Sequence, residues 1–375
     1  MNVELDLRAR ESVPTWLGYA TPVFTVLAAL IVSGVALLIL DVSPIAAYGT
    51  MFVDTLSSEF GIRETVVKSV PLILTGLAVY VPLRAGLWNI GAEGQLLLGA
   101  LAGTWVGVNV SLPPVALLPL MFVAAAAVGA LWAGIPGWLR AKWDVNEIIT
   151  SLLLTFAAVQ IQNYLLRGPM RGGTGNFPGT ALLSEFGATL PVVGDFVPLP
   201  YVGGVHIGLP VALLMVAVTY VLFAKTRTGF EVTFVGSNDE AAVQAGMSKY
   251  RVYIFVFLLA GAFAGIAGIA EIAGVQGRFR PSFGPGYGFT AIPIALLGRN
   301  SAIKVMFAGL FFALLFVGGT SMEVAHGVPA ALVEIIQALV ILFLITAEFF
   351  KRYRVGISIE REPTGATPAA QGGGD

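Results

Sequence analysis

The sequence predicts an all-α integral membrane protein, a bundle of about ten transmembrane helices of which one or more are broken or half-length. Hydrophobic residues make up 57% of the 375 residues, charged residues only 11%, and the mean hydropathy is +0.85. Soluble domains carry roughly 25% charged residues, so this chain cannot cover itself with a hydrated surface. Because one span needs about 20 apolar residues, the hydrophobic content leaves no room for a sizeable soluble domain.

Apolar runs follow one another from residue 19 to residue 350. The ten that could cross a bilayer are Tyr19–Leu40, Thr65–Leu83, Ala92–Val110, Val115–Leu139, Asn146–Leu165, Val205–Ala224, Val252–Val275, Phe289–Gly298, Ala302–Met322 and Pro329–Phe350. The first is too long for the core of a signal peptide, which predicts an uncleaved span. The eighth is too short to cross alone. It predicts an extension back through Gly286 or a half-helix that neighbouring helices cover.

The distribution of basic residues favours an arrangement with both termini in the cytoplasm. With ten spans and an inner N-terminus, fifteen of the 21 Lys and Arg residues lie on the inner side and six on the outer side, as the positive-inside rule requires. The layout is then a cytoplasmic segment 1–18, a membrane domain 19–350 and a basic, then disordered cytoplasmic tail 351–375. Within the membrane domain, 166–204 is a long external loop and 225–251 a cytoplasmic loop. We expect a multi-pass protein of the plasma membrane.

The composition also excludes several functions. A net charge of −1 removes the electrostatic basis for nucleic-acid binding, and the absence of cysteine removes thiolate metal sites, iron–sulfur clusters and cysteine nucleophiles. No G-x-x-x-x-G-K-[ST] pattern for phosphate binding is present. The two histidines, His206 and His326, have no carboxylates at metal-site or catalytic spacing. We therefore expect no catalytic residues, metal or cofactor in this chain, and no hydrolysis of ATP by it.

The cytoplasmic loop 225–251 contains the clearest local signal. Residues Ser237–Glu240 match a capping box, which predicts a short helix over about Asn238–Ala245 that Gly246 ends in the left-handed conformation. Three alanines would give this helix a small-residue face that could dock into a groove, although a plain linking helix without a partner is the alternative. The residues expected to contact a soluble partner are Ser237, Glu240, Ala241, Ala242 and Gly246.

Residues 84–95, RAGLWNIGAEGQ, follow Pro82 and hold three glycines. Glycine and proline permit a break in a helix, where free backbone groups can hold a polar solute. Asn89, Glu93 and Gln95 would then add side-chain groups to the site. The alternative is a tight inner turn between two spans, in which Glu93 caps the next helix. The sequence leaves both interpretations open.

Polar side chains in other spans mark a candidate path, because they are costly within a bilayer. Those expected near the outer level are Gln160, Gln162, Asn163, Glu271, Gln276, Glu334 and Gln337. They could line a vestibule, or they could reach the lipid headgroups from positions close to the interface. Phe283 and Tyr287, among glycines and prolines, could stack on a base or a sugar face, or belong to an interfacial aromatic belt.

Four segments resemble, in matching order, the membrane permease subunits of ATP-binding-cassette (ABC) importers, in the branch that serves simple sugars and nucleosides. They are WNIGAEGQ at Trp88–Gln95, NEIIT at Asn146–Thr150, EAAVQAG at Glu240–Gly246 and GFTAIPIALLG at Gly288–Gly298. The resemblance extends from about Val66 to Lys351. The chain departs from other importer classes after Gly246, where their Ile-x-Leu-Pro ending is replaced by MSKYRV.

The resemblance implies a function in import. The chain would form the translocation path for a nucleoside and would be driven through the 237–246 helix by a separate cytoplasmic ATPase that binds ATP and Mg²⁺. It implies two further partners, a second permease subunit that is identical or related, and an external substrate-binding lipoprotein. A permease for simple sugars, pentose or hexose, is the nearest alternative.

An ion-coupled secondary transporter is the alternative from another class. It would need acidic residues near the midplane of the membrane as proton or sodium sites. The acidic residues here lie towards the ends of spans instead, which favours the ABC permease.

Overall fold

The computed structural model describes residues 2–9, 15–172, 178–197, 203–281, 283–284, 286–298 and 301–360. The chain divides into two compact units, a larger unit Leu37–Val333 and a terminal unit formed by Met1–Ala36 with Glu334–Asp375.

The larger unit is helical. Its elements are α2 (Pro44–Tyr48), η1 (Gly49–Asp54), α3 (Thr55–Ser57), α4 (Glu59–Arg84), α5 (Ala92–Asn109), α6 (Pro114–Trp143), α7 (Glu147–Arg167), η2 (Leu183–Phe186), η3 (Val193–Asp195), α8 (Gly208–Lys225), α9 (Arg227–Ser237), α10 (Asp239–Gln244), α11 (Lys249–Glu271), η4 (Ile272–Gln276), α12 (Tyr287–Leu297) and α13 (Ala302–His326).

The terminal unit joins the two ends of the chain. It holds most of α1 (Thr15–Ile39) and of α14 (Ala330–Arg352), and the strands β1 (Asn2–Ala9) and β2 (Tyr353–Glu360). These strands pair antiparallel, with Asn2 opposite Glu360. The stretch Glu360–Asp375, which its composition predicts to be disordered, lies outside the described residues except for Glu360, which ends β2.

The prediction of a helical membrane protein is confirmed, and the ten-span count stays a prediction. All ten apolar runs lie on helices, and six of the helices in the described part of the chain are long and apolar enough to cross a membrane. Those six are Glu59–Arg84, Pro114–Trp143, Glu147–Arg167, Gly208–Lys225, Lys249–Gln276 and Ala302–His326. Helix α12 has only 11 residues, as expected for the short eighth run.

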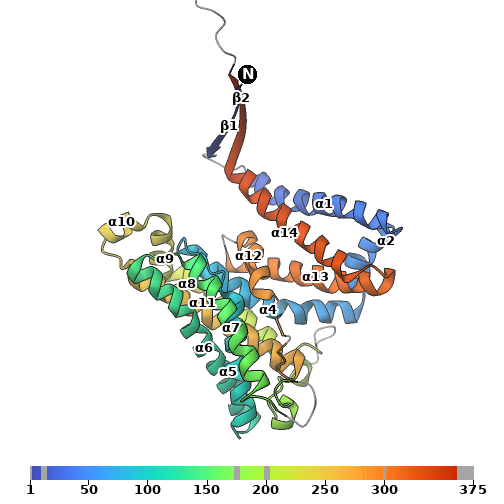
Figure 1. Cartoon of the computed structure of the whole chain (residues 1–375), viewed down its shortest axis with the longest axis vertical. Coiled ribbons are helices and arrows are strands. Elements are labelled where there is room, and N and C mark those ends of the chain that lie inside the picture. The colour runs from blue at the N-terminus through green and yellow to red at the C-terminus, as the bar shows by residue number, and fades with distance from the viewer. Residues whose placement is uncertain are drawn as a thin grey trace, which may run out of the picture. The chain divides into compact units, whose positions relative to one another are not determined.

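Helix α11 packs against α4, α5 and α6 in the larger unit (Figure 1). A side chain at Gly265 would overlap the backbone of α6 at Ala125, and one at Gly261 would overlap the backbone at Gly129. Small residues at these positions let the helix backbones meet. The glycines of α11 therefore permit its close contact with α6.

The larger unit has two ends that hold different loops. The first, here named the Lys249 end, brings together residues 84–88, 140–147 and 225–251 through hydrogen bonds and ion pairs. The second, here named the Gln276 end, brings residues 178–190 against 273–279 and the end of α7 against 280–283. The predicted cytoplasmic and external loops therefore lie at opposite ends of α11.

Candidate functional site

The turn that joins α4 to α5 holds three of the predicted site residues. Asn89 Nδ2 donates to Gln95 Oε1 over 2.9 Å, and Gln95 Nε2 donates back to Asn89 Oδ1 over 2.8 Å. Asn89 Nδ2 also lies 3.2 Å from the carbonyl oxygen of Ala78. That oxygen lacks its usual helical donor, because the residue four positions on is Pro82. The two buried amides therefore satisfy each other and a proline break in α4.

Glu93 lies in the first turn of α5 but caps a different helix. Its Oε2 accepts a hydrogen bond from the backbone N–H of Gly288 over 2.7 Å, and its Oε1 accepts one from Gly286 over 3.0 Å. The carboxylate thereby binds the free amides at the start of α12, where the N-cap residue Gly286 offers no side chain. A side chain at Gly288 would overlap the backbone of Glu93. The structure therefore differs from the expectation that Glu93 caps the next helix along the chain.

A second polar cluster lies around Tyr287, the first residue of α12. Its hydroxyl accepts a hydrogen bond from Lys68 Nζ over 2.6 Å and lies 3.4 Å from Glu271 Oε1. Gln276 Nε2 donates to the same Glu271 oxygen over 3.0 Å. The structure thus brings together three predicted path residues, Tyr287, Glu271 and Gln276. Lys68 was not among the predicted path residues, although a lone lysine within an apolar run was the signal for it.

Three aromatic side chains of segment 277–289, those of Phe279, Phe283 and Tyr287, pack within the protein, whereas Phe289 is 44% exposed. Gln162 Nε2 donates to the backbone oxygen of Phe283 over 2.8 Å. The ring of Phe283 packs edge-on against that of Phe279, with 5.4 Å between centroids, and Phe279 and Tyr287 are buried. The buried position of Tyr287 disfavours both the stacking surface and the interfacial belt for that residue.

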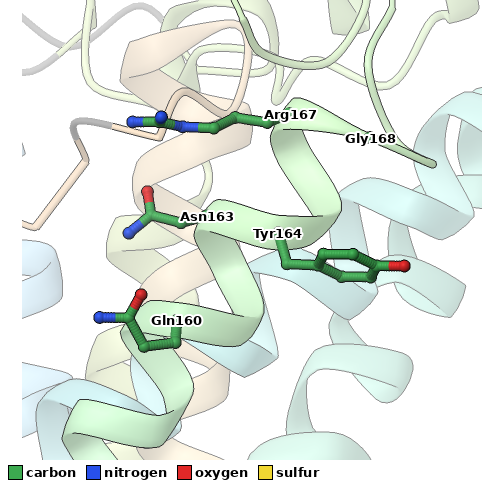
Figure 2. A pocket seen from close by; sticks show the side chains of 5 residues that line it. All are labelled: Gln160, Asn163, Tyr164, Arg167 and Gly168. Carbon is green, nitrogen blue, oxygen red and sulfur yellow. The ribbon is translucent and has the colours of Figure 1, made fainter.

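Helix α7 presents polar side chains on its surface near the Gln276 end. Gln160, Asn163 and Arg167 point to one side of the helix and Tyr164 to another (Figure 2). Together with Gly168 they line an open pocket of about 540 Å³. Gln160 and Arg167 are exposed in the isolated chain. A spanning helix with such a face is expected to meet protein or water there, since polar groups facing lipid are costly.

Glu334 and Gln337 lie three residues apart on α14, in the terminal unit. Their meeting with Gln160, Glu271 and Gln276 of the larger unit in one vestibule stays a prediction.

At the Lys249 end, the loop 225–251 forms two helices where one was predicted. Helix α10 is capped by Asn238, whose Oδ1 accepts from the N–H of Ala241 over 2.9 Å. Ser237 instead ends α9, and its hydroxyl donates to the carbonyl oxygen of Thr233 over 2.9 Å. The expected Ser237 capping box is therefore wrong by one residue. Gly246 adopts a φ of +80°, as predicted for the stop of this helix.

The surface of α10 also differs from the expected docking face. Ala242 is fully buried against the protein, so it cannot contact a soluble partner, whereas Glu240 and Gly246 are exposed. Val243 is 53% exposed and was missed by the sequence analysis. An isolated valine in a polar helix is too weak a signal without the orientation of that helix.

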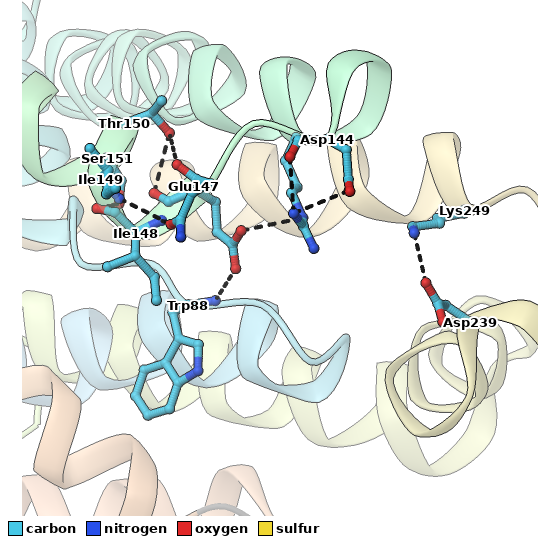
Figure 3. Close-up of polar contacts among 11 residues, drawn as sticks. Trp88, Asp144, Glu147, Ile148, Ile149, Thr150, Ser151, Asp239 and Lys249 are labelled. Atoms are coloured by element: carbon cyan, nitrogen blue, oxygen red, sulfur yellow. Dashed lines mark hydrogen bonds and ion pairs between the residues drawn. The ribbon is translucent and has the colours of Figure 1, made fainter.

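Helix α10 is held on α11 by an ion pair. Lys249 Nζ donates to Asp239 Oδ2 over 2.6 Å (Figure 3). The hydrogen bond and charge of the Lys249 ammonium lower the pKa of Asp239 below its ordinary value. The pair joins the first residue of α10 to the first residue of α11.

Helix α9 lies directly on the α4–α5 turn. Arg84 Nη2 donates to Thr233 Oγ1 over 2.9 Å. A side chain at Gly236 would overlap the backbone of Arg84, and Gly86, with a φ of +75°, faces the backbone of Gly236. The α9–α10 pair therefore contacts the turn that holds Asn89.

Glu147 fixes the other side of the same turn (Figure 3). Its Oε1 accepts from the backbone N–H of Trp88 over 3.3 Å, and its Oε2 lies 3.3 Å from Arg140 Nε. The start of α7 and the end of α6 are thereby joined to the α4–α5 turn. No three His, Asp or Glu side chains in the described ranges lie together as a metal site.

Comparison with known proteins finds a permease family model and relatives that are named as ABC transporter permeases. Residues 61–345 match the family model described as branched-chain amino acid transport system / permease component. The glucose ABC transporter permease protein TsgB13 of Haloferax volcanii is 71% identical over 100% of this chain and 99% of its own length. The guanosine ABC transporter permease protein NupP of Bacillus subtilis is 34% identical over 86% and 92%, respectively.

The nucleoside ABC transporter permease protein NupB of Lactococcus lactis is 29% identical over 86% of this chain and 89% of its own length. No solved structure shows a significant match to the chain.

Proposed function

We propose, because the chain belongs to the simple-sugar/nucleoside family of ABC importer permeases, that it carries a simple sugar across the plasma membrane. The sugar is placed first because a relative that is 71% identical over the whole chain is named a glucose permease. A nucleoside, the first expectation from the sequence, becomes the second candidate, on the 34% and 29% identity of relatives named for guanosine and nucleosides.

The structural observation that carries the proposal is the exposed polar face of α7. Gln160 and Asn163 offer both donors and acceptors, and Arg167 offers donors only. A sugar hydroxyl needs both kinds of partner. A second permease subunit, identical or related, would cover this face and enclose a polar path between the two subunits. The 540 Å³ pocket would then be part of that path.

Energy would come from a separate ATPase. This partner would bind ATP and Mg²⁺ on the cytoplasmic side, at the Lys249 end, and contact the exposed residues of α10. The external binding lipoprotein would deliver the solute at the Gln276 end. ATP binding must favour one orientation of the permease by a differential interaction, since equal affinity for both orientations shifts nothing.

Uptake by the reconstituted complex tests the proposal. Vesicles holding both permeases, the ATPase and the binding protein should import labelled glucose only when ATP is supplied, and unlabelled guanosine should compete poorly. Competition by guanosine that exceeds competition by glucose would instead favour the nucleoside. Import that persists without ATP while an ion gradient is kept, from a protein that captures no ATPase, would contradict the ABC mechanism and favour ion coupling.

Variants of α7 test the path. Gln160→Leu with Asn163→Leu should reduce uptake while leaving ATPase capture intact, because the pair lies far along α7 from the Lys249 end. Leu153→Gln, on the same helix and already 59% exposed, is the matched control for a changed surface. Full uptake by the double variant would remove these two residues from the path.

A further inference from the structure

Three of the four segments that resemble the permease family, far apart in sequence, meet at the α4–α5 turn and the start of α5. Segment Trp88–Gln95 bonds to Asn146–Thr150 through the Trp88 N–H and Glu147, and to Gly288–Gly298 through Glu93. The fourth segment, Glu240–Gly246, follows α9, which lies on the same turn. Hydropathy alone gives no reason for this convergence.

The contact between α9 and the turn is made by backbone. Gly236 and Gly86 leave no side chain between the two segments, so a displacement of α9 meets the turn without an intervening flexible group. The Arg84 to Thr233 hydrogen bond, on the same side, opposes separation of the two segments.

The turn itself is braced along its length. The Asn89–Gln95 amide pair closes residues 89–95 into a ring, and Asn89 attaches this ring to α4 at Ala78. Glu147 holds Trp88 at the other side. A segment held at these points moves as one body rather than absorbing a displacement.

The turn is attached to α12 by two hydrogen bonds from one side chain. Glu93 is 4% exposed, and each of its carboxylate oxygens takes one backbone amide of α12. Tyr287, between those two amides in sequence, carries the hydroxyl that meets Lys68 and Glu271. A shift of Glu93 would therefore move both the start of α12 and the polar cluster near the Gln276 end.

We propose that Glu93 is a positioning residue for transport, which passes movement of the α9–α10 pair through the α4–α5 turn to α12. The inference rests on the proposed function, in which the ATPase moves α10. In that function, α12 is the element of the membrane domain that moves in response to α10. Chains of hydrogen bonds and packed elements can carry coupling between distant sites, and here each contact is a named hydrogen bond or a backbone approach.

The test is the number of ATP molecules hydrolysed for each glucose or guanosine imported, measured on the assembled complex in vesicles. Glu93→Gln keeps the size of the side chain but turns an N–H donor towards one of the two amide donors. We expect this ratio to rise at least fivefold, with hydrolysis in the absence of solute within twofold of wild type. Glu93→Asp keeps both oxygens on a shorter chain and should give an intermediate ratio.

A loss of fold would lower hydrolysis and import together and leave the ratio unchanged, which separates it from a positioning role. Glu59→Gln, an exposed carboxylate at the start of α4, is the matched control and should keep the wild-type ratio. A wild-type ratio in Glu93→Gln, with hydrolysis and import both at wild-type levels, would overturn the inference. Absence of ATP-driven import by the wild type would instead overturn the proposed function, and the inference with it.

A second variant tests the same connection from the α9 side. Thr233→Val keeps the shape of the side chain but removes the acceptor of the Arg84 bond, and its control is the exposed Thr228→Val. Thr233→Val should raise the ratio, and combining it with Glu93→Gln should raise it no further than the larger single effect. Independent, multiplying effects would show that the two residues do not share one route and would overturn the proposal, as would an unchanged ratio in Thr233→Val.

Discussion

The amide pair in the α4–α5 turn allows a quantitative prediction, because its two members leave different numbers of buried polar groups without partners. Asn89→Leu leaves three buried groups without a hydrogen-bond partner. They are the carbonyl oxygen of Ala78, which Pro82 already deprives of its helical donor, and both ends of the Gln95 amide. Each buried group without a partner costs about 1–3 kcal/mol. We therefore expect Asn89→Leu to lower the free energy of unfolding by about 4 kcal/mol.

The partner substitution and the double variant give the discriminating comparison. Gln95→Leu leaves only the oxygen and one N–H of Asn89 without a partner, because the other N–H still donates to the Ala78 oxygen. It should lower the free energy of unfolding by about 2–3 kcal/mol. The double variant, Asn89→Leu with Gln95→Leu, leaves only the Ala78 oxygen without a partner and should lower the free energy of unfolding by about 1–2 kcal/mol. The double variant should therefore be more stable than Asn89→Leu alone.

Unfolding in mixed micelles with increasing SDS, followed by tryptophan fluorescence, measures these differences. Asn109→Leu, an exposed amide at the end of α5 that bonds only to Trp105, should change stability by no more than about 0.5 kcal/mol. If the double variant loses as much free energy of unfolding as the two single variants added together, the reasoning from buried groups without partners is refuted. Adding Pro82→Ala to the double variant should recover stability, since it restores the N–H that Ala78 lacks.

Three further predictions concern the Lys249 end. The Lys249 ammonium lowers the pKa of Asp239, so the pair stabilises α10 above the pKa of an unfolded aspartate, about 3.9, and this stabilisation is lost as the pH falls through the lower folded pKa. Hydrogen exchange of α10 should show that acid step, and Asp239→Asn should lack it. Gly246→Val places a β-branched residue at a φ of +80°, and import that stays normal would argue against α10 as the coupling element. Val243→Asp should reduce capture of the ATPase at least tenfold, whereas the neighbouring exposed Gln244→Asp should not; equal capture would exclude Val243 from the contact.

The sequence predicted the features that depend on one segment at a time. Each of the ten apolar runs falls on a helix, the short α12 included. The φ of Gly246 was also predictable, because a helix stop in the left-handed conformation is a local property. The predicted capping residue was one position early, since the amphipathic α9 extends through Ser237 and moves the start of α10 to Asn238.

The features that join distant segments were not predictable from one sequence. Glu93 and Gly286 are 193 residues apart, and Lys68 and Tyr287 are 219 apart, so no local pattern pairs them. The burial of Ala242 likewise depends on what α10 packs against. A polar residue in an apolar stretch shows that a partner exists, but its identity depends on helix packing.

Pro82 gives a physical reason for the polarity of segment 84–95. A proline in α4 deprives the Ala78 oxygen of its donor, and in a membrane domain water does not replace it. Asn89 supplies the donor, and it in turn requires Gln95 to satisfy its own oxygen. The resulting ring holds the start of α5 in place, and with it the Glu93 carboxylate at the N-terminus of α12. The amides that the sequence suggested as a solute site are therefore explained by the need to keep this turn rigid, and rigidity is what transmission from α9 to α12 requires.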